Sequence, residues 1–453
     1  MQEKQLEKEG LTTVLEMAKQ ARLASQKLAS LDDDARKQAL LAMASAIAEN
    51  KDELLKANAA DMENAQRLLE AGEISQPMVS RLKLSDAKID DIINGIKQVA
   101  SLPDPLKVRS MGTELDSGLE LYRVSAPIGV LAIIFESRPD ALPQIASLCM
   151  KTGNAVLLKG GKEAENSNKV LFKCLTEAGR SAGLPEHSMS LLNTREDVAQ
   201  ILKADGYVDL IIPRGSNSLV RHIQDNTRIP VLGHADGICH LYVHEDADLE
   251  MAVRLTIDSK TQYPSACNAL ETLLIHEAIR DKFLDMLLPE LKKCGVETRL
   301  DGSIYDALEK KGKLDNFKGS VKKADAEDWS TEYCDLILSV KEMRDLDEAV
   351  EHINQYGSGH TDCIVTPKSE TFEKFFDGVN SAGVYHNAST RFADGFRYGF
   401  GAEVGIATGK MHPRGPVGLE GIVTYKYRLE GSGQIVADYS GENGKQFSHK
   451  QLI

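Results

Sequence analysis

The fold is decided by the stretch Pro127-Ile-Gly-Val-Leu-Ala-Ile-Ile-Phe-Glu-Ser-Arg-Pro139. Within it, Val130–Phe135 is apolar at every position, which is typical of a strand buried on both faces of a parallel sheet. Two further apolar runs follow, Ala155–Leu158 and Val208–Ile212, with enough chain between the runs for helices. This repetition of strand, turn and helix predicts an α/β fold built on a doubly wound parallel sheet.

Each apolar run is followed by a polar turn, namely Glu136-Ser-Arg138, Lys159-Gly-Gly-Lys162 and Arg214-Gly-Ser216. Doubly wound sheets bind ligands beyond the carboxyl ends of their strands, so these turns are expected on one rim. The second turn combines glycines that admit a phosphate with two cations, and the third precedes a helix whose free N–H groups favour an anion. A surface turn and a simple helix start are the alternatives. Neither a Gly-x-Gly-x-x-Gly fingerprint nor a complete kinase phosphate loop is present.

The rest of the chain divides by its periodicity. Residues up to about 102 have helical spacing, with Asp32 and Ser85 as expected helix caps. After residue 236 the α/β alternation starts again and predicts a second domain. Its expected strands are Leu241–Val243, Thr272–Ile275, Leu336–Val340 and Ala382–Asn387.

Two segments fit neither α/β domain. Thr113–Val124 is expected to form a projecting β-hairpin around the three-residue loop Asp116-Ser-Gly118. Val423–Leu429 alternates apolar and polar residues, as a half-buried strand does. The tail after Glu430 is rich in glycine and polar residues and is expected to be mobile.

Composition limits the classes of function. The 453 residues are enough for two or three domains. A net charge of -14 argues against nucleic-acid or membrane binding, so an anionic substrate needs a local basic pocket. Seven scattered cysteines fit a reducing cytoplasm, and neither a secretory signal nor a membrane span is predicted. No cluster of His, Cys and acidic residues has the spacing of metal ligands, so no metal is expected.

Cys267 is the candidate nucleophile. It lies in Thr261-Gln-Tyr-Pro-Ser-Ala-Cys-Asn-Ala-Leu-Glu271, where a Pro-Ser-Ala turn precedes an expected strand. A thiol on a loop at the mouth of a sheet can ionise and attack an electrophile. A cysteine by itself is more often a small buried hydrophobe, so this assignment depends on its neighbours elsewhere in the chain.

A second concentration of functional groups lies in Ser389–Gly401, which holds Arg391 and Arg397 with four aromatic residues and three glycines. A long surface loop is the alternative, but arginines with aromatics and glycines at this density more often line a site. His360, in Gly359-His-Thr-Asp-Cys363, suits a structural histidine and a ligand equally well.

Together these stretches resemble the gamma-glutamyl phosphate reductase (glutamate-5-semialdehyde dehydrogenase) family of the aldehyde dehydrogenase superfamily. The stretches that carry the resemblance span nearly the whole chain in order: Pro127–Pro139, Gly153–Glu163, Pro213–Asn217, Pro230–Gly237, Thr261–His276 and Asn387–Glu403. The resemblance implies an aldehyde dehydrogenase-like fold with a doubly wound cofactor domain, a second α/β catalytic domain and a small β flap for oligomerisation.

The resemblance also implies a reaction: reduction of L-glutamyl 5-phosphate by NADPH to L-glutamate 5-semialdehyde and phosphate through a cysteine thioester, in proline biosynthesis. Cys267 falls at the nucleophile. Ser137 replaces the amide that binds the oxyanion in the wider superfamily, so the Cys267 backbone N–H and Asn268 become the candidate oxyanion donors. Arg138, Arg391 and Arg397 are the candidates for holding the carboxylate and phosphate of the substrate.

The cofactor residues follow from the same resemblance. Lys159 falls at the adenosine ribose, with Gly160, Gly161 and Lys162 beside it, and Arg214-Gly215-Ser216 falls at the pyrophosphate. Glu332 falls at the nicotinamide ribose, and the alternative for it is a solvated glutamate. NAD-using relatives commonly carry an acid where Lys162 stands, so a lysine there predicts a preference for NADPH. The glutamate that activates water in hydrolytic relatives falls at about His234, which favours a reductase that keeps its thioester.

Two other functions remain open at this stage: a hydrolytic NAD(P)-dependent aldehyde dehydrogenase and a non-catalytic nucleotide-binding subunit. The expected division is a cofactor domain (1–112 and 127–234), a catalytic domain (235–415), an oligomerisation flap (113–126 and 416–440) and a tail (441–453). The expected state is a cytoplasmic homo-oligomer, a dimer or tetramer, with a glutamate 5-kinase as a candidate partner and no nucleic acid or membrane.

Overall fold

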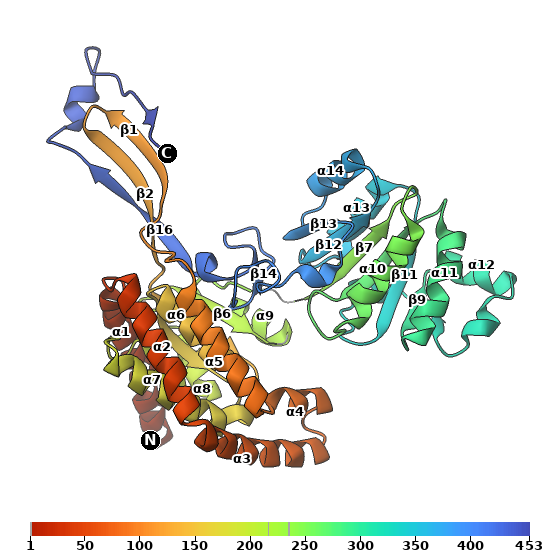
Figure 1. Cartoon of the computed structure of the whole chain (residues 1–453), viewed down its shortest axis with the longest axis horizontal. Coiled ribbons are helices and arrows are strands. Elements are labelled where there is room, and N and C mark those ends of the chain that lie inside the picture. The colour runs from red at the N-terminus through yellow and green to blue at the C-terminus, as the bar shows by residue number, and fades with distance from the viewer. Residues whose placement is uncertain (1, 216, 234–235) are drawn as a thin grey trace.

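The computed structural model describes residues 2–215, 217–233 and 236–453. Two α/β lobes and a β flap that projects away from them make up the molecule (Figure 1). The α/β architecture with parallel sheets predicted from the sequence is therefore confirmed. Within the described ranges, no helix is long and apolar enough to cross a membrane.

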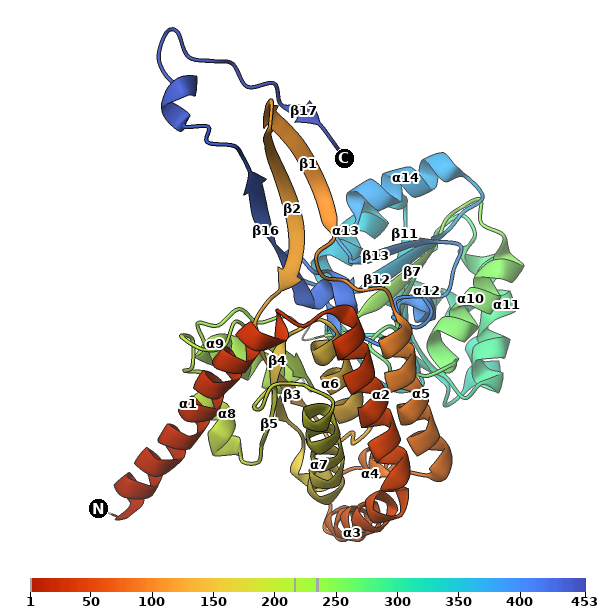
Figure 2. The same ribbon diagram turned by 60° about the vertical axis from the view of Figure 1, so that its left-hand side comes forward.

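The first lobe opens with helices, as the periodicity predicts. They are α1 (Gln2–Leu28), α2 (Asp33–Glu49), α3 (Lys51–Glu70), α4 (Gln76–Leu82) and α5 (Asp86–Ser101). Both expected caps are confirmed, because the side chain of Asp32 accepts from the backbone N–H of Ala35 and that of Ser85 from Lys88. Helices α2 and α5 pack side by side (Figure 2).

A sheet of parallel strands in the order β5-β4-β3-β6 forms the centre of this lobe. Its elements are β3 (Val130–Phe135), α6 (Ala141–Lys151), β4 (Ala155–Lys159), α7 (Glu165–Ser181), β5 (Met189–Leu192), α8 (Arg195–Ile201), β6 (Leu210–Arg214) and α9 (Asn217–Asn226). The chain steps outward from β3 to β5 and then returns to the other side of β3, which confirms the doubly wound order. Ile134 pairs with Lys159 and Phe135 with Arg214, so the predicted rim is confirmed for the described residues.

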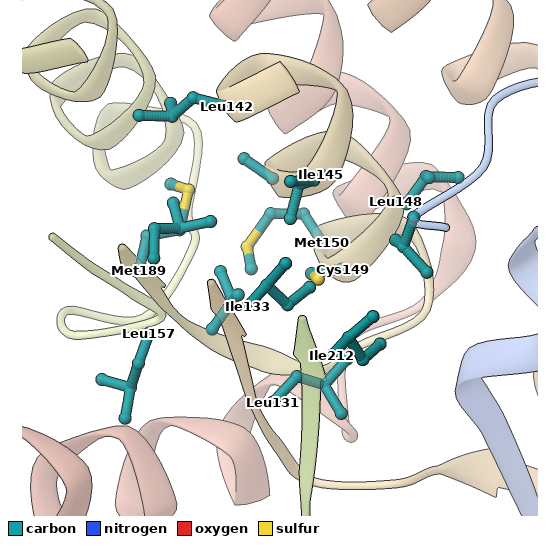
Figure 3. Close-up of a cluster of buried hydrophobic side chains, with 14 of the residues drawn as sticks. Leu131, Ile133, Leu142, Ile145, Leu148, Cys149, Met150, Leu157, Met189 and Ile212 are labelled. Carbon is teal, nitrogen blue, oxygen red and sulfur yellow. The ribbon is translucent and has the colours of Figure 1, made fainter. Parts of the chain in front are cut away.

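The core of the first lobe lies where α6 packs on β3 (Figure 3). Ile133 and Leu131 from the strand meet Ile145 and Cys149 from the helix, and all four side chains are buried. Truncating a large side chain in such a close-packed core costs about 2–5 kcal/mol, because the neighbours refill the space only in part. This packing gives the polar turns at the strand ends a rigid base.

The second lobe is built on a seven-stranded parallel sheet in the order β10-β9-β11-β8-β7-β12-β13. Its strands are β7 (Cys239–Val243), β8 (Leu270–His276), β9 (Glu297–Leu300), β10 (Val321–Lys323), β11 (Ile337–Met343), β12 (Thr361–Val365) and β13 (Gly383–His386). Its helices are α10 (Leu249–Thr261), α11 (Arg280–Lys293), α12 (Gly302–Lys310), α13 (Leu346–Tyr356) and α14 (Ser369–Gly378). The four expected strands are confirmed. The sequence analysis missed β9, β10 and β12, because none of them is an uninterrupted apolar run.

The flap is an antiparallel sheet in the order β16-β2-β1-β17. Its strands are β1 (Arg109–Asp116), β2 (Leu119–Pro127), β16 (Val423–Glu430) and β17 (Lys450–Gln451). The hairpin is confirmed, but its turn has two residues rather than three, because Asp116 still belongs to the strand. The half-burial expected for β16 is wrong: all its residues except Val423 are exposed, since β16 is an edge strand of a projecting sheet.

The tail after Glu430, expected from its composition to be mobile, lies against the flap. A 3-10 turn at Val436–Tyr439 follows β16, and β17 then pairs with β1. The short pair β14 (Ile406–Ala407) and β15 (Gly415–Pro416) lies between the two lobes (Figure 1). The other 3-10 turns are Lys162–Ala164, Leu314–Phe317, Asp328–Ser330, Thr390–Phe392 and Leu419–Ile422.

Candidate active site

Cys267 lies in the turn that connects α10 to β8, just before that strand begins at Leu270. The loop position predicted from the sequence is therefore confirmed. The turn stands at the amino edge of a parallel sheet, and Cys267 is partly exposed there. Its backbone carbonyl accepts a hydrogen bond from the thiol of Cys239 at 3.5 Å, which ties the turn to the start of β7.

His360 is the nearest side-chain partner of the Cys267 thiol that the structure defines. Its Nε2 lies 3.2 Å from the Cys267 Sγ, and its Nδ1 lies 2.9 Å from the Oγ1 of Thr361. The imidazole is only 1% exposed, directly before β12. His360 therefore contacts both the predicted nucleophile and a neighbouring threonine.

Gly237 explains how the thiol turn can lie so close to its surroundings. A Cβ placed on Gly237 would lie 2.4 Å from the Cys267 carbonyl oxygen and 2.6 Å from the Glu332 Oε1. Both distances are below the contact limit, so only glycine fits without displacing the turn. The glycine brings the Glu332 carboxylate and the Cys267 turn together over the start of β7.

The burial of Cys267 and the two carboxylates near it keep its thiol protonated. Burial, followed by the carboxylates of Glu332 and Glu403, raises the pKa of the Cys267 thiol to about 12. Arg391 and Arg214 lower this pKa without offsetting the rise. At neutral pH the thiol therefore needs a proton acceptor before it can act as a nucleophile.

Asn268 supports the loop next to it. Its side-chain Nδ2 donates to the backbone carbonyl of Ala393 at 2.9 Å and to that of Arg391 at 3.4 Å. The backbone carbonyl of Asn268 accepts from the hydroxyl of Thr390 at 2.7 Å. The amide hydrogens are thus directed at backbone carbonyls, where they would not meet an oxyanion. Of the two donors suggested by the sequence, the backbone N–H of Cys267 is left as the better candidate.

The second polar turn of the first lobe is tightly packed. Lys159 is buried and donates from its Nζ to the carbonyl of Gly160, whereas Lys162 is exposed. A Cβ on Gly161 would lie 2.4 Å from the Ser137 Oγ. Glycine at this position therefore allows the two turns to pack closely.

The third polar turn brings a buried cation to the rim. A Cβ on Gly215 would lie 2.7 Å from the Oε1 of Glu136, so a larger residue here would displace that side chain. The Nη1 of Arg214 is buried and has no hydrogen-bond partner among the described residues. Burial, followed by the charge of Arg138, lowers the pKa of Arg214. Ser216, the third predicted residue here, lies outside the described residues.

The three candidate substrate arginines occupy two places. Arg391 is buried and donates from Nε to the Gln262 Oε1 at 2.9 Å, and Arg397 donates from Nη1 to the Arg391 carbonyl at 2.5 Å. Burial, followed by the charge of Arg397, lowers the pKa of Arg391. Arg138 is exposed on the first lobe and pairs with Asp140 at 2.9 Å. Two of the three arginines thus share one loop, and that loop contacts Asn268.

Comparison with known proteins places this arrangement in a family. The model of the aldehyde dehydrogenase family matches residues 4–335. Gamma-glutamyl phosphate reductases of Methanococcoides burtonii and Acetivibrio thermocellus are 51% and 52% identical over 97% of the chain, covering 97% and 98% of those proteins. The chain belongs to the aldehyde dehydrogenase family, among its gamma-glutamyl phosphate reductases.

Solved structures of the family agree with the fold. The gamma-glutamyl phosphate reductase of Thermotoga maritima superposes with a TM-score of 0.87 at 38% identity, over 93% of this chain and 99% of that one. A glyceraldehyde-3-phosphate dehydrogenase of Methanocaldococcus jannaschii complexed with NADP has a TM-score of 0.63 at 17% identity, over 93% and 95% of the two chains. The second likeness concerns the fold alone.

In this member of the aldehyde dehydrogenase family, a cavity of about 170 Å³ adjoins the thiol partner His360. Two aromatic residues, Tyr398 and Phe400, and the cation of Arg414 line it together with the imidazole, Thr361 and Pro416. A larger cavity of about 310 Å³ lies along α7, where its lining falls between residues 172 and 189 and includes none of the predicted site residues. The smaller cavity is therefore the one that concerns the chemistry.

Sequence reasoning left His360 undecided and gave no role to Gly237 or Glu403. His360 is 93 positions from Cys267, and only the strand order of the second sheet brings the two together. Glu403 was noted as the end of a matching stretch; in the structure its Oε2 accepts from the N–H of Gly395 at 2.9 Å, and burial raises its pKa. No His, Cys, Asp and Glu cluster among the described residues is arranged to hold a metal ion.

Proposed function

We propose that the chain catalyses the NADPH-dependent reduction of L-glutamyl 5-phosphate to L-glutamate 5-semialdehyde and phosphate in proline biosynthesis. Relatives that are 51% and 52% identical carry the name of this reductase over nearly their full length. The observation that carries the proposal is the Cys267 thiol, which lies on the turn before β8 with its Sγ 3.2 Å from the Nε2 of His360. A thiol there suits an acyl phosphate, because sulfur can bond to the acyl carbon as phosphate leaves.

The chemistry follows from the thiol. The Cys267 sulfur bonds to the acyl carbon, and phosphate leaves with the electron pair of the broken C–O bond, which gives a thioester. NADPH supplies hydride when it is bound. The carbonyl then re-forms, the C–S bond breaks and the aldehyde is released. Phosphate needs little protonation to leave, so no strong general acid is required for this step.

We place NADPH on the rim of the first lobe, and the residues there fit it. The buried Nη1 of Arg214, which has no hydrogen-bond partner among the described residues, is a donor suited to a pyrophosphate oxygen. Glu332, whose carboxylate lies beside Gly237 as the Cys267 turn does, is proposed to hold the nicotinamide ribose. The remaining members of the proposed set are Lys159, Gly160, Gly161, Lys162, Gly215 and Ser216. The exposed Lys162 is proposed to attract the 2′-phosphate, which would give NADPH its advantage over NADH.

We propose that the glutamyl group occupies the cavity beside His360. Arg391 and Arg397 repel each other across their shared loop, so an anion between them would be favoured. Arg414 at the cavity adds a further cation for the amino-acid carboxylate. Arg138, exposed and paired with Asp140, is the weakest of the three predicted substrate ligands.

For the whole molecule we propose the division expected from the sequence: residues 1–112 with 127–234, residues 235–415, the flap 113–126 with 416–440, and the tail 441–453, whose strand β17 joins the flap sheet. The flap exposes Tyr425, Tyr427 and Leu429 on an edge strand, which supports assembly of a homo-oligomer through it. All seven cysteines are free, which supports a cytoplasmic location. A glutamate 5-kinase would be the upstream partner that supplies the acyl phosphate.

The competing hydrolytic function differs in what releases the thioester. His234, which stands where hydrolytic relatives place their water-activating glutamate, lies outside the described residues. Steady-state oxidation of L-glutamate 5-semialdehyde with NADP⁺ distinguishes the two functions. The proposed reductase turns over only with inorganic phosphate or arsenate, and its rate saturates with phosphate. Sustained oxidation in phosphate-free buffer would show a hydrolytic enzyme instead.

A further inference from the structure

We propose that His360 is the catalytic base that removes the proton of the Cys267 thiol and the acid that returns it when the aldehyde is released. This deepens the proposed function, on which it rests. The thiol must lose its proton before sulfur can attack the acyl carbon, and the contact between Nε2 and Sγ supplies a base for it.

The tautomer of His360 is suited to that role. Nδ1 lies 2.9 Å from the Thr361 Oγ1, so the proton on Nδ1 can be donated to this hydroxyl oxygen. Nε2 then carries a lone pair and accepts from the Cys267 thiol at 3.2 Å, within the range for sulfur. The ring is 1% exposed and held at the start of β12, so it has little freedom to turn away.

The surroundings of the thiol make an acceptor necessary. Burial is the largest cause that raises the pKa of Cys267 to about 12, so less than about one thiol in 10⁴ would be ionised at neutral pH without help. The groups that face the Cys267–His360 pair come from both lobes and from the cavity. They are Glu332, Glu403, Arg391, Arg214, Cys239, Asp362, Tyr398 and Arg414.

The proton balance closes over one turnover. His360 Nε2 takes the proton of the Cys267 thiol, sulfur bonds to the acyl carbon, and phosphate leaves with the C–O electron pair. After hydride transfer, the oxygen re-forms the carbonyl and the C–S bond breaks. Sulfur then takes the proton back from His360, so both side chains return to their starting states, and the released phosphate equilibrates with solvent.

The position of the imidazole relative to the cavity supports this path. His360 contacts Cys267 on one side and lines the cavity of about 170 Å³ on the other. An acyl group bound at the His360 end of that cavity would therefore lie next to the imidazole that contacts the Cys267 sulfur. No rearrangement of β8 or β12 is required for the proton transfer, because the two atoms are already within reach.

Alkylation of Cys267 by iodoacetamide, followed site by site with mass spectrometry, tests the inference without substrate. In His360→Gln we expect alkylation at pH 7 to slow by about 10²-fold or more, and kcat/KM to fall by about 10²–10⁴-fold. The deficit should shrink as the pH rises, because free thiolate then forms without a base. His276→Gln, at the opposite end of β8, is the matched control and should behave as wild type.

Thr361→Val provides a second variant, since it keeps the shape but removes the hydroxyl that orients the ring. It should slow alkylation by about tenfold at pH 7, and the difference in rate from wild type should again shrink as the pH rises. Wild-type alkylation rates and pH profiles in either folded variant would overturn the role of His360. The alkylation assay reports on the thiol alone and therefore tests the role of His360. Failure of phosphate-dependent turnover in wild-type protein would instead count against the proposed function.

Discussion

The two α/β lobes place their functional groups at opposite ends of their parallel sheets. In the first lobe the candidate groups follow the carboxyl ends of β3, β4 and β6. In the second lobe Cys267 precedes β8 and His360 precedes β12, so both lie at the amino edge. The general rule for doubly wound sheets thus locates the ligand rim of the first lobe but not the nucleophile of the second.

Cys267 and His360 can meet at the amino edge of the second sheet because, among the described residues, only Gly237 and the start of β7 lie between them. β7 separates β8 from β12 in the sheet, and Gly237 stands just before β7. Without a side chain there, the Cys267 turn crosses the end of β7 and reaches His360. Arg214 of the first lobe acts on the thiol across the gap, so the rim of one sheet faces the amino edge of the other.

The largest expected effect is at the amino edge of the second lobe. Cys267→Ser should leave the fold and NADPH binding intact and reduce turnover by about 10³-fold or more, because an alkoxide forms far less readily than a thiolate. Steady-state rates and NADPH titration measure both properties. Cys294→Ser, at an exposed cysteine, is the control and should be fully active; an equal loss in both variants would remove Cys267 from its role.

The next largest expected effect is on stability, and it concerns the buried ion pair between Lys260 and Glu271. Lys260 Nζ lies 2.7 Å from the Glu271 Oε2, and both side chains are 0% exposed. Lys260→Met should lower the free energy of unfolding at pH 8 by about 3–5 kcal/mol, since Glu271 must then either stay charged without a partner or take up a proton on folding. The exposed pair Lys169–Glu165 on α7 is the control, and Lys169→Met should cost no more than about 0.5 kcal/mol in the same denaturation experiment.

The same pair gives stability a defined pH dependence. Burial raises the pKa of Glu271 to about 7, above the ordinary value of a glutamate in the unfolded chain. The stability that protonation of Glu271 contributes is therefore fully present below about pH 4.3 and is lost as the pH rises through about 7. Glu271→Gln should flatten this part of the stability profile, and an unchanged slope between pH 5 and 8 would contradict the raised pKa.

Substitution of Gly237 tests whether the site forms because the Cys267 turn crosses the end of β7. Gly237→Ala should reduce kcat by about 10²-fold, because the methyl group would displace the thiol turn from His360 and Glu332. Gly95→Ala, in α5 of the first lobe where a Cβ meets nothing, is the control and should be neutral or slightly stabilising. Full activity in Gly237→Ala would show that the turn has room to move.

The first-lobe rim is tested through cofactor preference. Lys162→Glu should shift the ratio of efficiencies from NADPH toward NADH by about 1–3 kcal/mol, the range of one charge-assisted contact. Lys310→Glu on α12 is the charge-matched control. If the NADPH to NADH ratio does not change in Lys162→Glu, this lysine is a surface residue with no part in cofactor choice.

The smallest expected effect concerns substrate affinity in the second lobe. Arg391→Ala should raise KM for L-glutamate 5-semialdehyde or phosphate by about tenfold, with little change in NADP⁺ affinity, because a cation is lost from the thiol side. Arg254→Ala, on the exposed face of α10, is the control. An unchanged KM for both ligands would exclude Arg391 from the substrate site.

The sequence predicted what local patterns determine. The apolar runs of β3, β4 and β6 gave the doubly wound sheet, and the loop before β8 placed Cys267 correctly. The flap strand β16 was found from its alternation, but its exposure was not, because alternation carries no information about whether a second layer covers the strand.

The positions of His360 and Gly237 relative to Cys267 depend on the strand order of the second sheet, which no local sequence pattern reveals. His360 meets Cys267 only because β12 lies next to β7 in the sheet, and Gly237 matters only because the thiol turn passes over it. Neither relation leaves a signal in the spacing of the residues. The direction of the Asn268 amide likewise depends on the carbonyls of a loop more than a hundred positions away.

The covalent route through Cys267 is tested most directly by mixing enzyme, NADP⁺ and L-glutamate 5-semialdehyde in phosphate-free buffer and following NADPH formation through the first turnover. The expected result is a burst of about one NADPH per Cys267, then no further reaction, with a mass increase on that residue; added phosphate should discharge it and start steady turnover. Sustained NADPH formation without phosphate, or a burst that survives in Cys267→Ser, would contradict a thioester-forming acyl-phosphate reductase.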